Sequence, residues 1–442
     1  MAQPSSIIKH GGAKEHRVEQ ASFIGVIAKN QKASGSVQNS AKSPASAEMA
    51  RPSLSAIKTA VQAFLPIFKT RAPGIERARQ VAAENVGALG DIGFYKLVRP
   101  TAFGGYEHEF AALVELIIEV GRACASTSWV CGLFAAHQWM LGLFPERAQE
   151  EFWGGNAGAN LCSSFAPACR AVAEADGFRL NGRWSFASGC DNAQWAFCSA
   201  ILPSHGEHES EPAFCVVPRT DYSIDDTWDV IGLAGTGSKT LVLGDVFVPV
   251  YRTLTFAEAA AGRSPGSRLH ANSLFAAPVY CNVSACLAAT AIGAATGALD
   301  DFIAGTSNRV TRGSVSGGSD RMAQFPTIQI KVAEAAALVD AARFILLRDV
   351  AAVARAVREN GEASIEQRIA NRRGQAFAVR LALRATDILN AAAGGSGLQM
   401  SNPIQRAWRD VNAVARHVSL NWDAVGAMYG QMALGLEPRG QY

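Results

Sequence analysis

The sequence predicts an α+β protein in which a helical N-terminal domain and a C-terminal four-helix bundle flank a middle domain of short strands. Apolar residues first recur at helical spacing, short alternating stretches bounded by glycine and proline follow, and four long amphipathic segments come last. No fixed period recurs along the chain, so a repeat architecture is not expected. The expected divisions are a flexible N-terminal arm over residues 1–50, a helical domain over 51–155, a β domain over 156–255 and a four-helix bundle over 270–442.

Length and composition describe a folded protein with a large core. The chain has 442 residues, of which 49% are hydrophobic and 18% charged, and its net charge is only +3. Since no basic run or arginine-rich stripe occurs, nucleic acid is not an expected partner. No apolar segment reaches transmembrane length free of charged or helix-breaking residues, and residues 1–69 lack the basic head and apolar core of a secretory signal. We therefore expect a cytoplasmic protein that does not bind a membrane.

The nine cysteines predict buried, reduced thiols. Their number is odd, and they form neither a CxxC pair nor a spacing with histidine that would suit a metal. They lie inside apolar or strand-like segments, where free cysteines of cytosolic proteins are commonly buried. A metal site is therefore not expected.

The first domain carries clear helical periodicity. One apolar face spans Leu54–Leu65, a second helix is expected over Ile75–Phe94, and a long apolar helical region covers Phe110–Phe144. Small residues around Ala125–Ser128 are expected to break that region. Pro145 can begin one more helix, because the missing amide hydrogen of proline has no helical partner at that position.

The stretch from Asn160 to Trp195 is where we expect the chemistry of the chain to be centred. It alternates polar and apolar residues as paired strands do, with turns expected at Pro167 and at Asn181-Gly182. The strand after the second turn carries Trp184 and Phe186 and ends in small hydroxyl residues. An aromatic face can stack on a flat ligand while a hydroxyl meets its polar edge. The alternative is that these aromatic residues belong to the core.

A glycine-rich run, Gly232–Ser238, precedes a strand expected over Thr240–Val248. Such a run can hold phosphate where it begins a helix. Here a strand follows, so a dinucleotide-binding fold is disfavoured and a tight turn between strands is expected.

The C-terminal region is expected to form an antiparallel four-helix bundle. Four long amphipathic segments lie between Leu274 and Leu436. The breaks between them are expected near Thr311–Gly318, Asn360-Gly361 and Gly394–Gly397.

Several short motifs in a fixed order carry a resemblance to a known family. They are Ser126-Thr127-Ser128-Trp129, Ala136-His137-Gln138-Trp139, Ser163–Pro167, Gly182–Gly189, Gly235–Ser238, Asp245–Pro249, Gly394–Gly397 and Arg409-Asp410. With the order of the domains, they resemble the acyl-CoA dehydrogenase fold, in which the middle domain is a small β-barrel. The residues from Ser53 to Leu436 most resemble the oxygenase components of two-component flavin-dependent aromatic monooxygenases, similar to p-hydroxyphenylacetate 3-hydroxylase.

The resemblance places a flavin ring against the middle domain. Ser163 and Ser164 resemble the strand residues that meet the pyrimidine edge of the flavin. Phe186 and Ser188 resemble the pair placed against the ring, with Ser188 near N5. Ser163 and Ser188 could instead be ordinary strand hydroxyls.

The resemblance also implies contacts with the other end of the flavin. Either Arg309 or Arg312 resembles the arginine that meets the flavin phosphate. The segment Gly395-Ser396-Gly397 resembles a loop that closes on the flavin from a neighbouring subunit, although a turn between two helices needs glycines in any case.

Two histidines complete the implied active site. His137 resembles the residue that contacts the polar group of the substrate, and His417 a histidine beside flavin C4a. The alternatives are a hydrogen-bonded core histidine for His137 and an interaction with helix-terminal carbonyls for His417. Asn412 stands where many relatives have a second histidine. Cys169 stands where a glycine is expected, which can alter the turn after Pro167.

The implied function is a reduced-flavin-dependent monooxygenase that hydroxylates a small phenol-like or indole-like substrate through a C4a-hydroperoxyflavin. A separate NAD(P)H:flavin reductase supplies reduced FMN, with FAD possible, molecular oxygen is the co-substrate, and a homotetramer is expected. The alternative function is an acyl-CoA dehydrogenase-type flavin dehydrogenase or oxidase. Such enzymes need a carboxylate base, and the matching position, Arg416-His417-Val418, has no glutamate. A non-catalytic flavin-binding protein is a third possibility.

Overall fold

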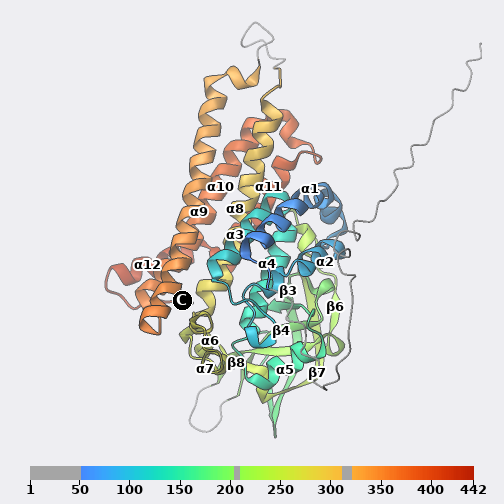
Figure 1. Ribbon diagram of the computed structural model, residues 1–442, viewed down its shortest axis with the longest axis vertical. Helices are drawn as coiled ribbons and strands as arrows, with labels where there is room; N and C mark the ends of the chain where they lie inside the picture. Colours follow the sequence, from blue (N-terminus) through green and yellow to red (C-terminus); the bar gives the residue numbers. More distant parts are fainter. Residues whose placement is uncertain (1–50, 204–209, 311–320) are drawn as a thin grey trace, which may run out of the picture. The chain divides into compact units, whose positions relative to one another are not determined.

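The computed structural model of the protein describes residues 51–203, 210–310 and 321–442. Residues 51–442 form one compact unit, in which helices come first, strands follow and helices return (Figure 1). The arm expected over 1–50 and the break expected near Thr311–Gly318 lie outside the described residues. The division of the unit into 51–155, 156–255 and 270–442 remains a prediction.

The first helices differ in one respect from the expected pattern. They are α1 (Leu54–Ala78), α2 (Ala83–Asp91), α3 (Phe110–Ala123), α4 (Ala125–Leu141) and α5 (Glu146–Gly155). The prediction of a second helix beginning at Ile75 was wrong, because α1 continues to Ala78 with Phe68, Ala72 and Ile75 extending its buried stripe. The expected break near Ala125 is confirmed at Cys124, whose extended backbone separates α3 from α4.

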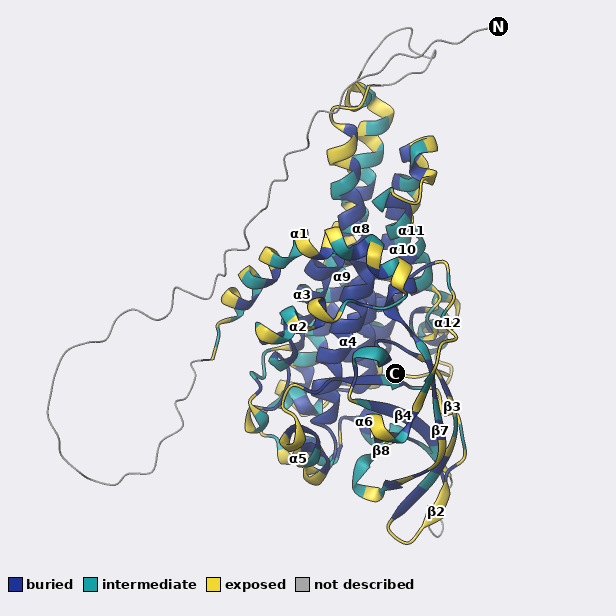
Figure 2. Cartoon of the chain, turned by 90° about the vertical axis from the view of Figure 1, so that its right-hand side faces the viewer, coloured by how far each residue is buried: buried dark blue, intermediate teal, exposed yellow. Residues whose placement is uncertain are grey.

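Helix α4 runs through the interior of the unit. Each of its residues is buried, so it has no solvent-facing side (Figure 2). A helix that is apolar all round belongs to a core. Two residues of the quoted motifs, Trp129 and His137, are therefore held in water-poor surroundings.

The strands of the middle region form two four-stranded sheets rather than one closed ring of strands. One has the order β1 (Leu161–Ser164), β4 (Trp195–Leu202), β5 (Glu211–Pro218) and β8 (Thr253–Thr255), and the other β2 (Val172–Glu174), β3 (Gly177–Ala187), β7 (Lys239–Pro249) and β6 (Ser223–Asp225). Trp184 joins them, since its fully buried indole on β3 donates a hydrogen bond to the Ser199 carbonyl on β4 at 2.7 Å. The region that we expected to be a small barrel therefore consists of two sheets that are joined by the Trp184 hydrogen bond.

The turn predicted at Asn181-Gly182 does not exist. Strand β3 passes through these residues, and the chain instead turns between β2 and β3. The pairing of β3 with β7 shifts twice, and each shift contains a non-glycine residue with positive φ: Asp245 at 55° and Phe186 at 66°. Such bulges leave a strand continuous while they redirect a side chain. Asn-Gly here belongs to an irregular strand and not to a hairpin.

The C-terminal bundle consists of α8 (Val279–Thr306), α9 (Pro326–Asn360), α10 (Ile365–Ala393) and α11 (Pro403–Ala415), followed by the short α12 (Trp422–Ala433). Two short helices, α6 (Phe256–Ala261) and α7 (Pro265–Leu269), lead into it. The breaks predicted at Gly361 and at Gly394–Gly397 are confirmed. Helix α8 is long and apolar enough to cross a membrane, but 94% of its most apolar window is buried, as in the core helix of a soluble fold.

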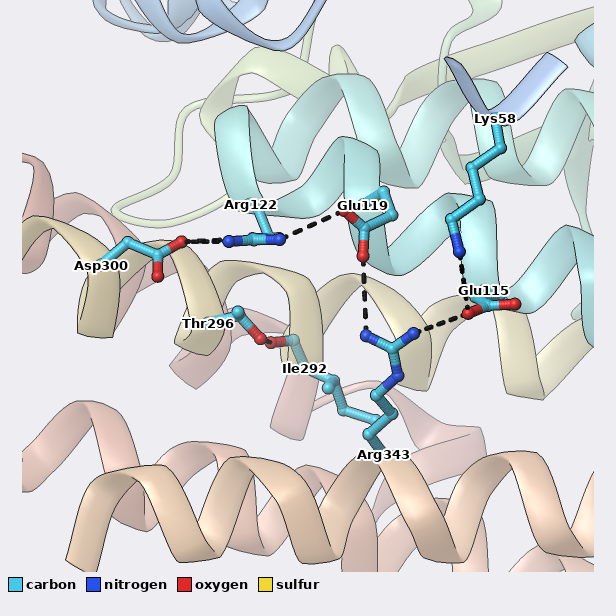
Figure 3. Close-up of polar contacts among 8 residues, drawn as sticks. All are labelled: Lys58, Glu115, Glu119, Arg122, Ile292, Thr296, Asp300 and Arg343. Atoms are coloured by element: carbon cyan, nitrogen blue, oxygen red, sulfur yellow. Dashed lines mark hydrogen bonds and ion pairs between the residues drawn. The ribbon is translucent and has the colours of Figure 1, made fainter. Parts of the chain in front are cut away.

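Ion pairs orient α3 against the bundle (Figure 3). Arg343 of α9 contacts Glu115 at 2.7 Å and Glu119 at 3.5 Å, and Arg122 pairs with Asp300 of α8 at 2.8 Å. Most of these groups are partly exposed, where an ion pair contributes about 0.2–1 kcal/mol. The docking of α3 therefore depends on close packing more than on charge.

Glycine lets α3 and α8 approach each other. A Cβ on Gly293 would lie 2.4 Å from the Ile118 carbonyl oxygen and 2.7 Å from the Gly121 Cα. We predict that Gly293→Ala lowers the stability of the protein by about 2 kcal/mol or more, because backbone has to move apart. Thermal unfolding measures the change. On the same helix, Gly305→Ala meets no atom within 4 Å and should be neutral or stabilising, so equal losses in both variants would contradict the packing argument.

Candidate active site

Ser188 and His417 lie on two sides of Trp129. The Trp129 indole nitrogen donates a hydrogen bond to the Ser188 hydroxyl at 2.9 Å. Its ring meets the His417 imidazole edge to face, with centroids 5.7 Å apart. Ser188 follows β3 and His417 follows α11, so α4 joins a residue of the sheets to a residue of the bundle. The structure therefore brings together two of the three expected catalytic residues, and it adds Trp129, to which the sequence assigned no role.

The glycine-rich run forms the tight turn expected before β7. Leu233 has a left-handed backbone with φ of 53°, and its amide donates to Asp410 on α11 at 2.6 Å. Gly235 lies so close to α1 that a Cβ would approach Ile75 to 2.4 Å. Burial raises the pKa of Asp410 to about 6, against the opposing effect of the Leu233 amide. The turn is thus fastened to the bundle at one buried carboxyl group.

His417 is held as a neutral hydrogen-bond donor. The Ser419 amide donates to its Nδ1 at 3.2 Å, so Nδ1 is the unprotonated nitrogen and the proton resides on Nε2. Burial, together with the positive charge of Arg372, lowers the pKa of His417 to about 4. Arg372 also donates to the Ser419 carbonyl at 2.7 Å and so holds the turn that orients the ring. Near neutral pH, His417 can offer an N–H but no positive charge.

His137 has the opposite protonation. Its Nδ1 lies 2.7 Å from the Leu161 carbonyl oxygen, which can only accept, so Nδ1 carries the proton. Its Nε2 is buried and has no hydrogen-bond partner among the described residues. The rings of Phe165 and Phe197 surround it, and burial lowers the pKa of His137 to about 4. His137 therefore presents an unpaired acceptor in apolar surroundings, roughly 12 Å along α4 from Trp129.

Phe186 is held out from the sheet. It is 72% exposed, its φ is 66°, and it meets the Trp228 ring edge to face at 6.1 Å between centroids. A strained backbone that exposes a large aromatic residue is typical of a binding surface. This geometry favours the ligand contact over the core position that we also considered for Phe186.

Ser163 and Ser164 cannot both face one ligand with their side chains. They are neighbours on β1, where successive side chains point to opposite faces. Ser164 is buried, and its hydroxyl donates to the Ser185 carbonyl at 2.8 Å, next to Phe186. Ser163 is the more exposed of the two. The hydroxyl open to a ligand is therefore that of Ser163, while Ser164 supports the strand that carries Phe186.

Arg309 and the loop Gly395–Gly397, which are expected to contact the phosphate end of the flavin, lie at the other end of α11 from His417. Arg309 is exposed and donates to the Ala393 carbonyl at 3.3 Å, directly before the loop that contains Gly395, Ser396 and Gly397. The thirteen residues of α11 span roughly 20 Å between this loop and His417. Within one chain, Arg309 and this loop therefore lie far from His417. Arg312 lies outside the described residues.

The side chains around Trp129 fit a reduced flavin. Phe186 offers an exposed aromatic face beside the half-buried Trp228, and His417 offers a donor. Ser188 is a hydroxyl that accepts from one indole and keeps further acceptor capacity. No cluster of three metal-ligating side chains occurs within residues 51–203, 210–310 and 321–442. All nine cysteines are free, and all except the half-buried Cys169 are buried, as predicted.

Comparisons with known proteins first define the class. Residues 285–422 match the family model described as acyl-CoA dehydrogenase, C-terminal domain. The crystal structure of 3-HSA hydroxylase from Rhodococcus sp. RHA1 superimposes with a TM-score of 0.82 at 31% identity, over 87% of this chain and 98% of that one. The protein therefore has the acyl-CoA dehydrogenase fold, as predicted.

The sequence relatives then define the family. The oxygenase component of FADH(2)-dependent resorcinol hydroxylase from Rhizobium sp. (strain MTP-10005) is 55% identical over 381 residues, which cover 85% of this chain and 93% of that protein. XiaF from Streptomyces sp., solved with FADH2 and glycerol, superimposes with a TM-score of 0.79 at 27% identity, over 88% of this chain and 97% of that one. The chain belongs to the oxygenase components of two-component flavin-dependent aromatic monooxygenases. It is a reduced-flavin-dependent enzyme, and the acyl-CoA dehydrogenase alternative describes its fold and not its reaction.

The buried His137 predicts a loss of stability in acid. Its pKa is about 4 in the folded protein and near 6.5 in the unfolded chain, so only the unfolded chain binds the proton between these values. Stability is fully present above pH 6.5 and falls by about 3 kcal/mol as pH decreases to 4. In His137→Gln this contribution is missing, so the unfolding temperature should fall less between pH 7 and pH 4.5 than in the wild type. An equal fall in both proteins would show that His137 titrates normally.

Proposed function

We propose that this protein hydroxylates a dihydric phenol of the resorcinol type, with reduced FAD as the electron source and molecular oxygen as co-substrate. The 55% identity to a resorcinol hydroxylase described as FADH(2)-dependent supports both choices. The sequence motifs favour FMN, whereas the name of this relative specifies reduced FAD, and the higher similarity favours FAD. Because the family members are components of two-component systems, reduced flavin comes from a separate reductase, for which we propose NAD(P)H as the reductant. We also propose a cytoplasmic location.

The observation that carries the proposal is the opposite protonation of two histidines, the buried His137 and the half-buried His417. Reduced flavin, when bound, supplies the electrons that allow one atom of molecular oxygen to enter an aromatic ring. His417 offers its Nε2–H as a hydrogen-bond donor to the reacting oxygen. His137 offers its unpaired Nε2 as an acceptor to a substrate hydroxyl. When the hydroxyl proton is drawn toward Nε2, electron density rises at the ring carbon that receives the oxygen atom.

The burial of α4 supports the exclusion of water that this chemistry needs. Water would favour release of hydrogen peroxide over transfer of oxygen to the ring. Every residue of α4 between Trp129 and His137 is buried, and the Phe165 and Phe197 rings lie beside the His137 ring. The surroundings of the substrate hydroxyl are therefore apolar, with one acceptor.

We further propose that a homotetramer completes the flavin site. Arg309 and the loop Gly395–Gly397 lie together, but roughly 20 Å from His417 in the same chain. The bundle also exposes large apolar side chains, among them Phe344 at 67% and Leu398 at 80%. Such residues favour a surface that another subunit covers. The phosphate contacts of one flavin would then come from a neighbouring subunit.

The first test mixes the purified protein and chemically reduced FAD with oxygenated buffer and resorcinol. We expect a trihydroxylated product, with product formed close to the amount of reduced FAD consumed. Indole and a short acyl-CoA are the comparison substrates. Bleaching of oxidised flavin by the acyl-CoA, with no phenol hydroxylated, would overturn the proposed function.

Single substitutions separate the roles of the two histidines. His137→Ala should lower hydroxylation by roughly 10²-fold or more while reduced FAD is still oxidised at the wild-type rate, because only the substrate loses its acceptor. His417→Ala should also lower hydroxylation, by roughly 10²-fold, and should in addition change the rate of flavin oxidation. Product and hydrogen peroxide are measured together by chromatography and a peroxidase assay.

His270→Ala is the matched control for both variants. His270 is partly buried and hydrogen-bonded to Gln149 at 2.9 Å, away from Trp129 and Leu161. Its loss should leave the ratio of product to peroxide unchanged. If His137→Ala slowed flavin oxidation as much as hydroxylation, the separation of roles would be wrong.

A further inference from the structure

A line of four hydrogen bonds leads away from Ser188 into the protein. The Trp129 indole donates to the Ser188 hydroxyl at 2.9 Å, and that hydroxyl lies 2.7 Å from the Ser238 hydroxyl. Ser238 lies 2.7 Å from the Thr236 hydroxyl, which donates to the Leu233 carbonyl oxygen at 2.8 Å. The line thus connects α4, the end of β3 and the turn before β7.

The far end of this line determines the direction of every proton in it. A carbonyl oxygen only accepts, so the Thr236 proton is directed to Leu233. Ser238 must then donate to Thr236, and Ser188 must donate to Ser238, because each hydroxyl has a single proton. Thr236 is 1% and Ser238 4% exposed, so water does not offer these hydroxyls another partner. The proton of Ser188 is therefore directed inward, and what remains for a ligand is an acceptor lone pair.

The end of the line is rigid. Leu233 holds a left-handed backbone and donates its amide to the buried Asp410 at 2.6 Å, and its carbonyl also accepts from the Trp228 indole at 3.2 Å. The Gly189 amide, directly after Ser188, donates to the Thr236 carbonyl at 2.9 Å. The turn and the end of β3 therefore keep their separation, and the hydroxyls have little freedom to exchange partners.

We propose that Thr236 and Ser238 are positioning residues which hold Ser188 as a hydrogen-bond acceptor and so make the site prefer reduced over oxidised flavin. The inference rests on the proposed function and on the family resemblance, which places Ser188 near N5 of the flavin. In reduced flavin N5 carries a hydrogen and donates, whereas in oxidised flavin it presents a lone pair. An acceptor at Ser188 matches the first form and opposes the second. The enzyme would thereby bind reduced flavin tightly and release oxidised flavin.

Two substitutions should make the Ser188 hydroxyl donate its proton to the ligand instead of to Ser238. In Thr236→Val, Ser238 loses its acceptor and donates to Ser188, which frees the Ser188 proton for the ligand. In Ser238→Ala, Ser188 loses its inward acceptor, with the same result. For both, the ratio of the Kd of oxidised FAD to that of reduced FAD should fall roughly tenfold, the value of one hydrogen bond of about 1.4 kcal/mol. Anaerobic titrations measure the ratio, and the midpoint potential of bound FAD should decrease by about 30 mV.

Matched variants exclude a merely structural effect. Thr236→Ser keeps the hydroxyl and should restore the wild-type ratio. Thr386→Val removes another buried threonine hydroxyl, one that also donates to the carbonyl three residues earlier, at 2.9 Å, but lies on α10 outside the line. It should leave the ratio unchanged. Thr236 should therefore affect flavin binding only through its hydroxyl.

The outcomes separate this inference from the proposed function. A wild-type ratio in Thr236→Val and Ser238→Ala, with an altered ratio in Ser188→Ala, would overturn the role of the line. No change in Ser188→Ala, with resorcinol still hydroxylated, would overturn the contact between Ser188 and N5 and leave the function standing. Failure of the wild-type protein to bind reduced FAD would overturn both.

Discussion

The indole of Trp129 joins three parts of the molecule at one point. It lies on a helix that is buried along its whole length, donates to Ser188 at the end of a strand, and meets His417 after a bundle helix. A buried indole N–H needs an acceptor, and Ser188 provides it. Trp129 therefore sets the separation of Ser188 and His417, and the hydrogen bond from Leu233 to Asp410 joins the same parts of the fold a second time.

The polar groups of the site acquire their chemical character from their neighbours. The two histidines are both neutral because burial lowers their pKa values to about 4, yet one presents a lone pair and the other a proton. The difference arises from what touches Nδ1: a carbonyl oxygen at His137 and a backbone amide at His417. The neighbours of Ser188 likewise determine its role, because the Leu233 carbonyl, three hydrogen bonds away, decides in which direction the Ser188 hydroxyl donates.

Strain and close packing occur where the parts of the fold meet. Phe186 and Leu233 both hold left-handed backbones. Leu233 itself donates to α11, and the residues two positions further on, Ser188 and Gly235, contact α4 and α1. Left-handed conformations of such residues cost about 1 kcal/mol or more each and persist only when the surroundings enforce them. Here the surroundings are the buried Asp410 at one end and the shifted pairing of β3 with β7 at the other.

By itself the sequence determined the order of helices and strands, the fold class, and the family, because periodicity and ordered motifs are local properties of the chain. It also predicted Ser188, His417 and His137 as catalytic residues, and the structure brings the first two together. It did not distinguish the bulged strand from a hairpin at Asn181-Gly182, or the helix that continues through Pro73, because pairing and packing decide these. The roles of Trp129 and Thr236 were equally invisible to it. Only the tertiary structure decided those roles and the protonation of each polar group, since a hydrogen bond has a direction only when both partners are in place.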